Sequence, residues 1–336
     1  MLRLHRVTPT ADLWAERATY DDRLIFHTEP WLNFVAETQN ASPVLARVTD
    51  GAETVGHFTG LLTKRFGLRI LGSPMAGWTT SYGGFTLRPD VPRRAALRAL
   101  MPYAFNDLGC AHLEIRDRFA TVSDLAGLGL RWAEAPTATI SLRPTEEALF
   151  AAMSSACRRN IRKAERSGVT IEESVADPTF ADDFYDQLRD VFAKQNLVPT
   201  YPIDRVRALI RHLAPAGRLL LLRARDASGR CIATAVLPWH HRTMYFWGGA
   251  SYRTDQHLRP NELLIWHALR WARSHGLTEF DFVGGNAYKS KYGTVSVPVP
   301  WARRSRSPLI ANLRDAAAQG FALKQRTLAR LTNARG

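Results

Sequence analysis

The segment Gly276-Leu-Thr-Glu-Phe-Asp-Phe282 repeats the pattern of Gly109-Cys-Ala-His-Leu-Glu-Ile115, which lies 167 residues earlier. In each segment a glycine ends a helical stretch, and five residues later one carboxylate lies between apolar residues of an expected strand. An antiparallel meander and a glycine-containing loop precede both helices. A repeat of this length indicates a duplicated domain rather than a solenoid built from units of roughly 20–50 residues.

Each half of the chain combines a meander with a β-α-β piece, which is typical of a mixed sheet with flanking helices. The 336 residues are enough for two hydrophobic cores. We therefore predict an α/β (α+β) fold with two tandem domains, at residues 1–142 and 143–302, followed by a basic helical tail at 303–336. In this scheme the helix expected at 145–167 and the strand expected at 242–247 are each continuous.

Several classes of protein are excluded by what the sequence lacks. It has no apolar run near the roughly 18 residues of a membrane span, and no apolar segment typical of a signal peptide at its N-terminus. Cys110, Cys157 and Cys231 are scattered and form no CxxC pair, so neither a disulfide framework nor a metal site is expected. No GxSxG, GxxxxGK[ST] or HExxH motif occurs. We expect a cytoplasmic protein without a metal, and no sequence element indicates its oligomeric state.

The formal net charge of +14 is unevenly distributed. Residues 1–140 hold 15 basic and 14 acidic residues, residues 141–300 hold 22 and 16, and residues 301–336 hold 8 and 1. Such a surplus favours partners that carry phosphate, although a compositional preference for arginine is an alternative explanation, since only six of the 45 basic residues are lysine. The tail pattern at 308–331 predicts a basic amphipathic helix, which would contact an anionic membrane at the inner face or pack on the second domain.

A basic helix is expected at the start of the second domain. Arg158, Arg162 and Arg166 share one face at a spacing of four residues, Arg159 and Lys163 lie beside them, and a single acidic residue offsets the stripe. An anionic ligand would relieve the repulsion between these cations, and a solvated helix face is the alternative.

Two further segments carry candidate chemistry. Arg253, Arg259 and Asn261 surround the expected start of a helix, where unpaired backbone amides suit a phosphate group. The segment Phe280–Gly293 delivers Asp281, a Gly-Gly turn, and then two of the six lysines between two tyrosines. Lysine there could bind phosphate or stabilise an oxyanion, or the tyrosines could pack while the lysines stay on the surface.

The order of these segments resembles the FemAB/FemX branch of the GNAT superfamily, in particular acetyltransferase-like members of bacterial polysaccharide and envelope pathways. The resemblance is strongest over about residues 143–300. It implies two tandem GNAT-like domains and transfer of an acyl group from acyl-CoA to an amine of a cell-envelope, polysaccharide or small-molecule acceptor. Transfer of an aminoacyl group from aminoacyl-tRNA to a peptidoglycan precursor or peptide is the alternative. The family's glycine-containing [QR]-x-x-G-x-[GA] element is not matched at 256–262, which leaves aminoacyl-tRNA open as the donor and tRNA as a partner.

The resemblance also implies roles for particular residues. The family's YK-x-[KR]-[FY]-G element, on the donor side, is matched by Tyr288, Lys289, Lys291, Tyr292 and Gly293. The basic helix of the family is matched by Arg159, Arg162 and Lys163. The YGG loop expected near the acceptor, in the first domain, is matched by Tyr82, Gly83 and Gly84.

We expect an amine to attack a thioester or ester carbonyl held by the second domain. Asp281, Tyr288 and Lys289 are the candidate catalytic residues, and Tyr245 and Tyr252 are expected next to the substrate. Asp281 could equally be structural, since its counterpart Glu114 occupies the same place in the other half. A binding protein on a degenerate enzyme fold, recruited to an envelope or nucleic-acid assembly, is the rival interpretation.

Overall fold

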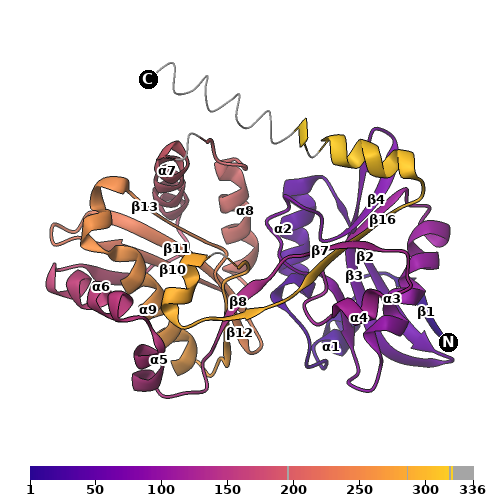
Figure 1. The fold of residues 1–336 in the computed structure, drawn as a ribbon, viewed down its shortest axis with the longest axis horizontal. Helices are drawn as coiled ribbons and strands as arrows, with labels where there is room; N and C mark the ends of the chain where they lie inside the picture. The colour runs from indigo at the N-terminus through magenta and orange to yellow at the C-terminus, as the bar shows by residue number, and fades with distance from the viewer. Residues whose placement is uncertain (195–196, 286, 318, 321–336) are drawn as a thin grey trace. The chain divides into compact units, whose positions relative to one another are not determined.

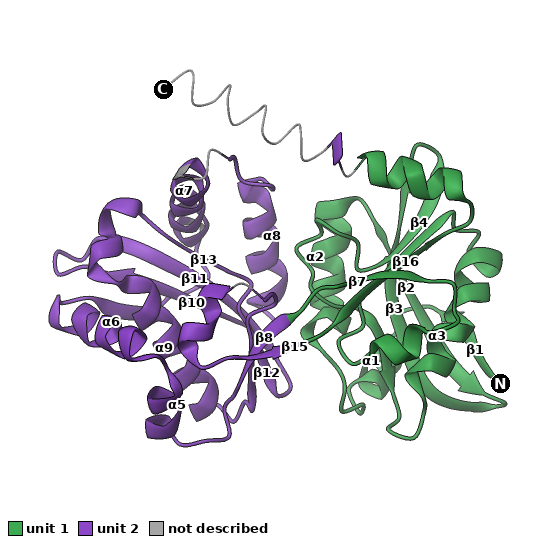
Figure 2. Cartoon of the chain, in the orientation of Figure 1, with its two compact units in different colours: residues 1–136, 298–318 green, residues 137–297, 319–336 purple. Residues whose placement is uncertain are grey.

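The computed structural model describes residues 1–194, 197–285, 287–317 and 319–320 (Figure 1). The chain forms two compact units (Figure 2). Unit 1 consists of Met1–Pro136 together with Pro298–Ala318, and unit 2 contains Thr137–Val297. The changes between units therefore fall a few residues before the expected boundaries at 142 and 302.

Unit 1 is built on a mixed sheet that has eight strands within the described residues, in the order β1-β2-β3-β4-β6-β16-β7, with β5 paired to β3. The strands are β1 Leu2–Val7, β2 Ser42–Asp50, β3 Glu53–Arg65, β4 Leu68–Ser73, β5 Gly84–Leu87, β6 His112–Ile115, β7 Arg131–Glu134 and β16 Pro300–Ser305. The helical elements are α1 Ala11–Arg17, η1 Ile25–His27, α2 Glu29–Gln39, α3 Arg93–Pro102, the π-turn η2 Tyr103–Asp107 and α4 Val122–Leu125. A further helix begins at residue 308.

Unit 2 repeats this architecture in the part of the chain that the structure covers, with the order β15-β8-β14-β12-β11-β10-β9 and with β13 paired to β11. The strands are β8 Thr137–Ser141, β9 Thr170–Glu173, β10 Leu219–Arg225, β11 Cys231–His240, β12 Thr243–Tyr245, β13 Gly248–Ser251, β14 Glu279–Asp281 and β15 Val295–Val297. The helical elements are α5 Glu146–Ala152, α6 Ser155–Arg166, α7 Pro178–Lys194, α8 Ile203–Leu213, η3 Arg253–Leu258, α9 Pro260–Ser274 and η4 Ala287–Tyr292. Figure 1 shows α5, α6 and α9 on one side of this sheet and α7 and α8 on the other.

The two sheets correspond strand by strand. Each has a three-stranded antiparallel meander, then a divided position (β4 and β5, or β12 and β13), then a parallel partner (β6 or β14). Two antiparallel strands complete each sheet. The expected α/β architecture with a mixed sheet, a meander and flanking helices in each half is confirmed.

The strands that complete the sheets are exchanged along the chain. β7 forms the edge of the first sheet, but the next strand, β8, pairs with β14 and β15 in unit 2. After β15 the chain returns, and β16 inserts between β6 and β7. We expected residues up to 302 to belong to the second domain, whereas Ala302 is buried in the core of unit 1.

Two expected elements differ from those in the structure. The helix predicted over 145–167 breaks at Met153-Ser154, because the Ser154 side chain accepts a hydrogen bond from Cys157 N and begins α6 as an N-cap. The strand predicted over 242–247 is shortened to β12, and the Gly248-Gly249 segment expected as a loop begins a second strand, β13; β12 and β13 pair with different parts of β11.

The expected basic tail lies partly outside the described residues, which include 308–317. That helix packs on unit 1, where Arg314 forms an ion pair with buried Glu114 at 2.7 Å. Its Leu309 and Leu313 side chains are exposed. Within the described residues, no helix combines the length and apolar character needed to cross a membrane.

The inserted strand gives a test of the fold. An Ala302→Asp substitution buries an unpaired charge between β6 and β7, and we expect it to lower the free energy of unfolding by roughly 3 kcal/mol or more. Urea denaturation followed by tryptophan fluorescence measures this loss. Ser296→Asp, at an exposed position of β15, is the matched control, and equal effects of the two substitutions would contradict the placement of β16.

Candidate functional site

The divided strand of unit 2 is where the candidate residues gather. Phe246 N donates a hydrogen bond to Asp281 O of β14 at 2.8 Å, and the next residue, Trp247, donates from its backbone N to Val236 O of β11 at 3.1 Å. Consecutive residues are therefore bonded to different strands. The sheet divides at this point, and the end of β14 lies beside the division, since Asp281 pairs with Tyr245.

Asp281 is the last residue of β14 and is completely buried. Its Oδ1 accepts hydrogen bonds from Thr137 Oγ1 and from Val283 N, both at 2.6 Å. Val283 has a φ of +50°, so the carboxylate holds a left-handed turn against β8. This geometry fits the structural alternative for Asp281, in which the carboxylate fixes the Gly-Gly turn.

Lys289 lies on the other side of the same turn. Its Nζ donates to Phe282 O at 2.9 Å and to Gly284 O at 2.8 Å, and the residue is buried. Burial lowers the pKa of Lys289 to about 8, although the charge of Asp281 opposes the shift. Tyr288 is half exposed, and its ring centroid lies 5.8 Å from Lys289 Nζ. The structure thus brings the three candidate catalytic residues together around one turn.

The lysine at 291 has a different partner. Its Nζ lies 2.8 Å from Glu262 Oε1, which also accepts a hydrogen bond from Asn160 Nδ2 at 3.0 Å. These three residues connect η4, the first turn of α9 and α6. Sequence reasoning missed the role of Glu262, although an acidic residue in the first turn of a helix is a recognisable signal, because it complements the helix dipole.

The first turn of α9 carries the residues expected to hold phosphate. Arg259 is its N-cap, with a φ of +62°, and both Arg253 and Arg259 are exposed. Asn261 Nδ2 donates to Ser251 Oγ at 2.9 Å, which ties the turn to β13. Pro260 offers no backbone amide, and the Glu262 carboxylate occupies the same turn.

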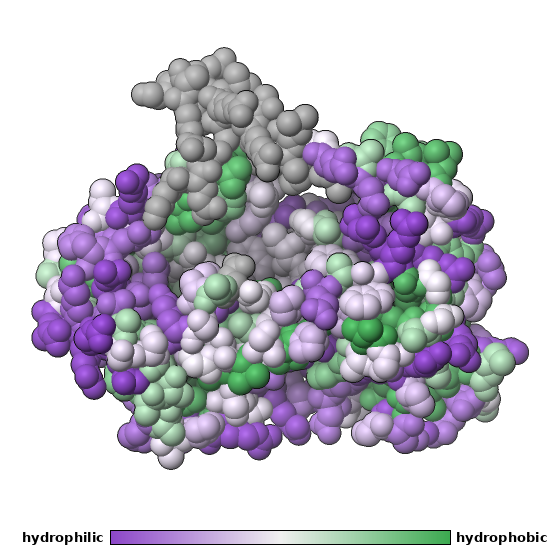
Figure 3. Space-filling view, viewed as in Figure 1, coloured by the Kyte–Doolittle hydropathy of each residue, from purple (hydrophilic) through white to green (hydrophobic). Residues whose placement is uncertain are grey.

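Only some of the basic residues of α6 are exposed. Arg159, Arg162 and Lys163 are exposed, and Figure 3 shows hydrophilic residues gathered over this part of unit 2. Arg158 is instead bonded to the backbone carbonyls of Ala151 and Met153, at the end of α5.

The candidate tyrosines of unit 2 mostly pack. Tyr292 is buried and stacks on Phe282, with ring centroids 5.5 Å apart, and Tyr245 is also buried. Tyr252 is half-buried, and its backbone N donates to Ile232 O. Gly293 has a φ of +78°, and a Cβ there would lie 2.8 Å from Ala152 O, so glycine is required at the end of this element.

The Tyr82-Gly83-Gly84 segment of unit 1 is buried. Gly84 N donates to Ser73 Oγ at 2.6 Å, and a Cβ at Gly83 would overlap Ser73. The Tyr82 ring faces the Arg116 guanidinium at 4.9 Å. Packing within unit 1 therefore explains why these residue types occur in the segment. Its expected position next to an acceptor stays a prediction.

Glu114 occupies in unit 1 the place of Asp281 in unit 2. It is buried, and its carboxylate accepts hydrogen bonds from Ala76 N and from Arg314. Burial alone would raise the pKa of Glu114, but hydrogen bonds from His112 and Arg314 outweigh burial and lower it to about 2. The segment 74–83 follows β4 here, and a Cβ at Gly72 would meet Trp78 at 2.8 Å, so the chain itself fills this side of unit 1.

Residues 151–292 match the model of a family described as "Acetyltransferase (GNAT) domain". A crystal structure of FemX superimposes with a TM-score of 0.72 at 15% identity, covering 89% of this chain and 96% of that one. A tandem GNAT protein from the clavulanic acid biosynthesis pathway superimposes with a TM-score of 0.55 at 13% identity, covering 92% of this chain and 99% of that one. The C-terminal domain of a putative lysylphosphatidylglycerol synthetase from Agrobacterium fabrum superimposes with a TM-score of 0.55 at 13% identity, covering 92% of this chain and 96% of that one. No curated protein sequence matches the chain.

The two mixed sheets, each with a divided strand, are therefore the fold of the tandem GNAT structures, and the family match at residues 151–292 supports acyl transfer as the class of reaction. The match to the GNAT domain model is confined to residues 151–292, and the chain has the fold of FemX over most of its length. The resemblance noted in the sequence is confirmed at the level of the fold. Among the described residues, no group of three or more histidine, cysteine, aspartate or glutamate side chains is arranged to hold a metal ion.

The contact between Lys291 and Glu262 can be tested by stability. Lys291→Met leaves the buried Glu262 carboxylate with Asn160 alone, and we expect it to lower the free energy of unfolding by roughly 1–3 kcal/mol. In the double variant Lys291→Met/Glu262→Gln no charge is left unpaired, so most of the loss should be recovered. Additive losses in urea denaturation would contradict the pairing.

Burial of Lys289 predicts a particular pH dependence of stability. Above about pH 8 the folded chain releases the Lys289 proton, while the unfolded chain keeps it until about pH 10.5. Stability from this group therefore rises with pH in that window, by at most about 1.4 kcal/mol per pH unit. The difference in unfolding free energy between the parent and Lys289→Met, measured from pH 7 to 10, isolates this contribution. A difference that does not change with pH would contradict it.

Proposed function

We propose that this chain transfers an aminoacyl group from an aminoacyl-tRNA to an amine, with the donor held by unit 2. The observation that carries the proposal is the first turn of α9. Ordinary GNAT enzymes grip the pyrophosphate of CoA at a glycine-containing helix start, whereas here Pro260 lacks an amide hydrogen and the Glu262 carboxylate lies in the turn. Because this carboxylate is paired with Lys291, the turn offers a pyrophosphate neither an unpaired lysine nor a full set of backbone amides.

The basic stripe of α6 supports an RNA donor. Arg159, Arg162 and Lys163 are exposed on a helix that contacts the same turn through the Asn160–Glu262 hydrogen bond. A row of exposed cations next to an acyl site suits the phosphate backbone of a polynucleotide. Regarding the acceptor, we propose an amine of a cell-envelope precursor, in keeping with the envelope pathways that the resemblance implies.

In this reaction the amine nitrogen attacks the ester carbonyl carbon of the donor. A C–N bond forms, the ester C–O bond breaks, and the ribose hydroxyl leaves with the proton that the amine gives up. Tyr288, half exposed beside the turn, is proposed to relay that proton. Asp281 and Lys289 are proposed as positioning residues that fix the turn from which Tyr288 projects.

Acetyl transfer from acetyl-CoA is the second candidate function, because the family model that matches residues 151–292 is that of an acetyltransferase domain. The two candidates differ in their donors, and a direct comparison of donors separates them.

The test measures binding of tRNA, and separately of CoA, by calorimetry, followed by transfer of a labelled amino acid from charged tRNA to an amine acceptor. The triple variant Arg159→Ala/Arg162→Ala/Lys163→Ala should weaken tRNA binding. It should also reduce the slope of log affinity against log salt concentration by roughly two to three, because about three phosphate contacts are lost.

A control variant removes the same charge elsewhere. Arg3→Ala/Arg65→Ala/Arg98→Ala removes three exposed arginines of unit 1 and should leave the salt dependence unchanged. Tight binding of CoA without measurable tRNA binding would replace the first candidate by the second. Failure to bind either donor or to transfer either group would favour the non-catalytic interpretation.

A further inference from the structure

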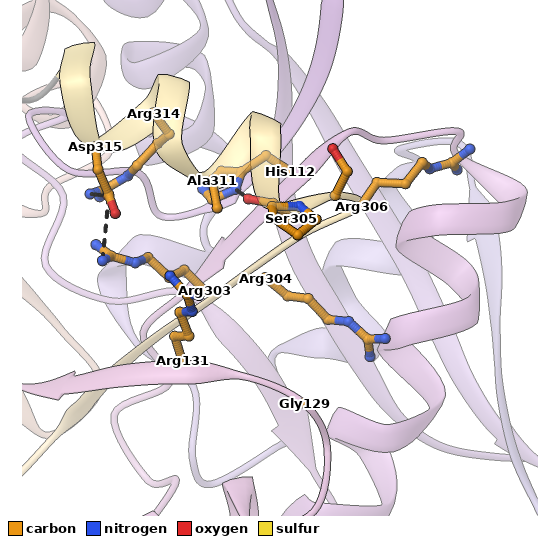
Figure 4. Close-up of a pocket in the computed structure, with 12 residues that line it drawn as sticks. His112, Gly129, Arg131, Arg303, Arg304, Ser305, Arg306, Ala311, Arg314 and Asp315 are labelled. Atoms are coloured by element: carbon orange, nitrogen blue, oxygen red, sulfur yellow. Dashed lines mark hydrogen bonds and ion pairs between the residues drawn. The ribbon is translucent and has the colours of Figure 1, made fainter.

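A polar layer lies in unit 1, between the β6-β16-β7 side of the sheet and the helix that begins at residue 308 (Figure 4). It surrounds a cavity of about 190 Å³. Arg131, Arg303, Arg314 and Asp315 line this cavity. Neither the duplicated core nor the GNAT domain at 151–292 accounts for these residues.

Two arginines of the layer oppose each other directly. Arg131 of β7 and Arg303 of β16 are cross-strand partners in an antiparallel pair, so their side chains emerge on the same face of the sheet. Like charges placed directly opposite each other repel and destabilise the sheet. Both arginines line the cavity, and an anion bound there would offset their repulsion.

The carboxylates within reach do not neutralise this pair. Glu114 is buried and is bound by Arg314 at 2.7 Å. Asp315 is shared between Arg314 at 3.2 Å and Arg303 at 3.4 Å. The Arg131 side chain has no ion pair or hydrogen bond with any residue that the structure describes, and it is exposed. Among Arg131, Arg303 and Arg314, one cation is therefore left that Glu114 and Asp315 do not offset.

The other residues that line the cavity include two more arginines. Arg304 and Arg306 also line the cavity, although their guanidinium groups are bonded to the backbone carbonyls of Leu128 and Phe105, and Figure 4 shows both side chains extending away from Arg303. Ser307 begins the helix at 308 by accepting a hydrogen bond from Ile310 N, and it lines the cavity as well. The positive end of that helix dipole therefore adds to the arginine charges.

We propose that this cavity binds a phosphate group, held by the guanidinium groups of Arg131 and Arg303. Guanidinium pairs with phosphate through two parallel hydrogen bonds, which makes arginine suited to this ligand. A cavity of about 190 Å³ has room for a phosphate group. The remainder of a phosphorylated ligand would lie outside the cavity.

Binding of pyrophosphate to the full chain tests the proposal. We expect it to raise the melting temperature beyond the effect of sodium chloride at equal ionic strength, and to titrate to saturation in calorimetry. Arg131→Ala should weaken this binding at least roughly tenfold, because two charge-assisted hydrogen bonds are lost. Without pyrophosphate, Arg131→Ala should be at least as stable as the parent, since the repulsion with Arg303 is removed.

Arg65→Ala, an exposed arginine at the end of β3, is the matched control and should bind pyrophosphate as the parent does. A second experiment measures binding of the protein to vesicles that contain phosphatidic acid. If Arg131→Ala weakens binding to these vesicles, the phosphate belongs to a lipid headgroup. If Arg131→Ala weakens binding of pyrophosphate but not binding to the vesicles, the phosphate belongs to a small soluble ligand. The proposal is overturned if neither probe distinguishes Arg131→Ala from Arg65→Ala, or if sodium chloride reproduces the whole effect.

Discussion

The exchange of strands between the two halves of the chain is the constraint on which the other features depend. Each sheet is completed next to its parallel pair by a strand that is remote in sequence: β16 beside β6, and β8 beside β14. Because β8 follows the edge strand of the first sheet, Thr137 reaches Asp281 and fixes the turn that carries Lys289. Because β16 lies beside β7, Arg303 comes to lie opposite Arg131. Both the candidate donor site and the arginine cavity thus follow from the exchange.

The duplicated carboxylates show how the two halves have diverged. Asp281 binds a hydroxyl and a backbone amide, and it holds a short turn beside the divided strand. Glu114 binds a histidine and an arginine, under a segment of the chain that fills the corresponding place. The same position therefore supports an open turn in one unit and a closed ion pair in the other, which accounts for the concentration of candidate chemistry in unit 2.

Local features of the fold could be predicted from sequence, and distant pairings could not. Gly109 and Gly276 end helices and have positive φ. Such helix ends depend on a few neighbouring residues, so the repeat of the two halves could be recognised in the sequence. The position of β16 depends on pairing with β6, roughly 190 residues earlier in the chain, and nothing in its own residues signals that partner. At the site, the segment with Asp281, Tyr288 and Lys289 was predicted as a group. Glu262 and Asn160 were not, because their contacts with Lys291 join three separate elements.

The return of β16 also has a consequence for synthesis on the ribosome. After β7 emerges, about 160 further residues must be translated before the strand that separates β6 from β7 exists, which takes on the order of 10–30 s at typical elongation rates. During that interval the nascent first half carries two unpaired strand edges, which are the kind of surface that chaperones shield and that promotes aggregation. The second half meets no such delay, because β8 has already left the ribosome when β14 and β15 appear. The C-terminal unit can therefore mature first, in the reverse of the usual vectorial order.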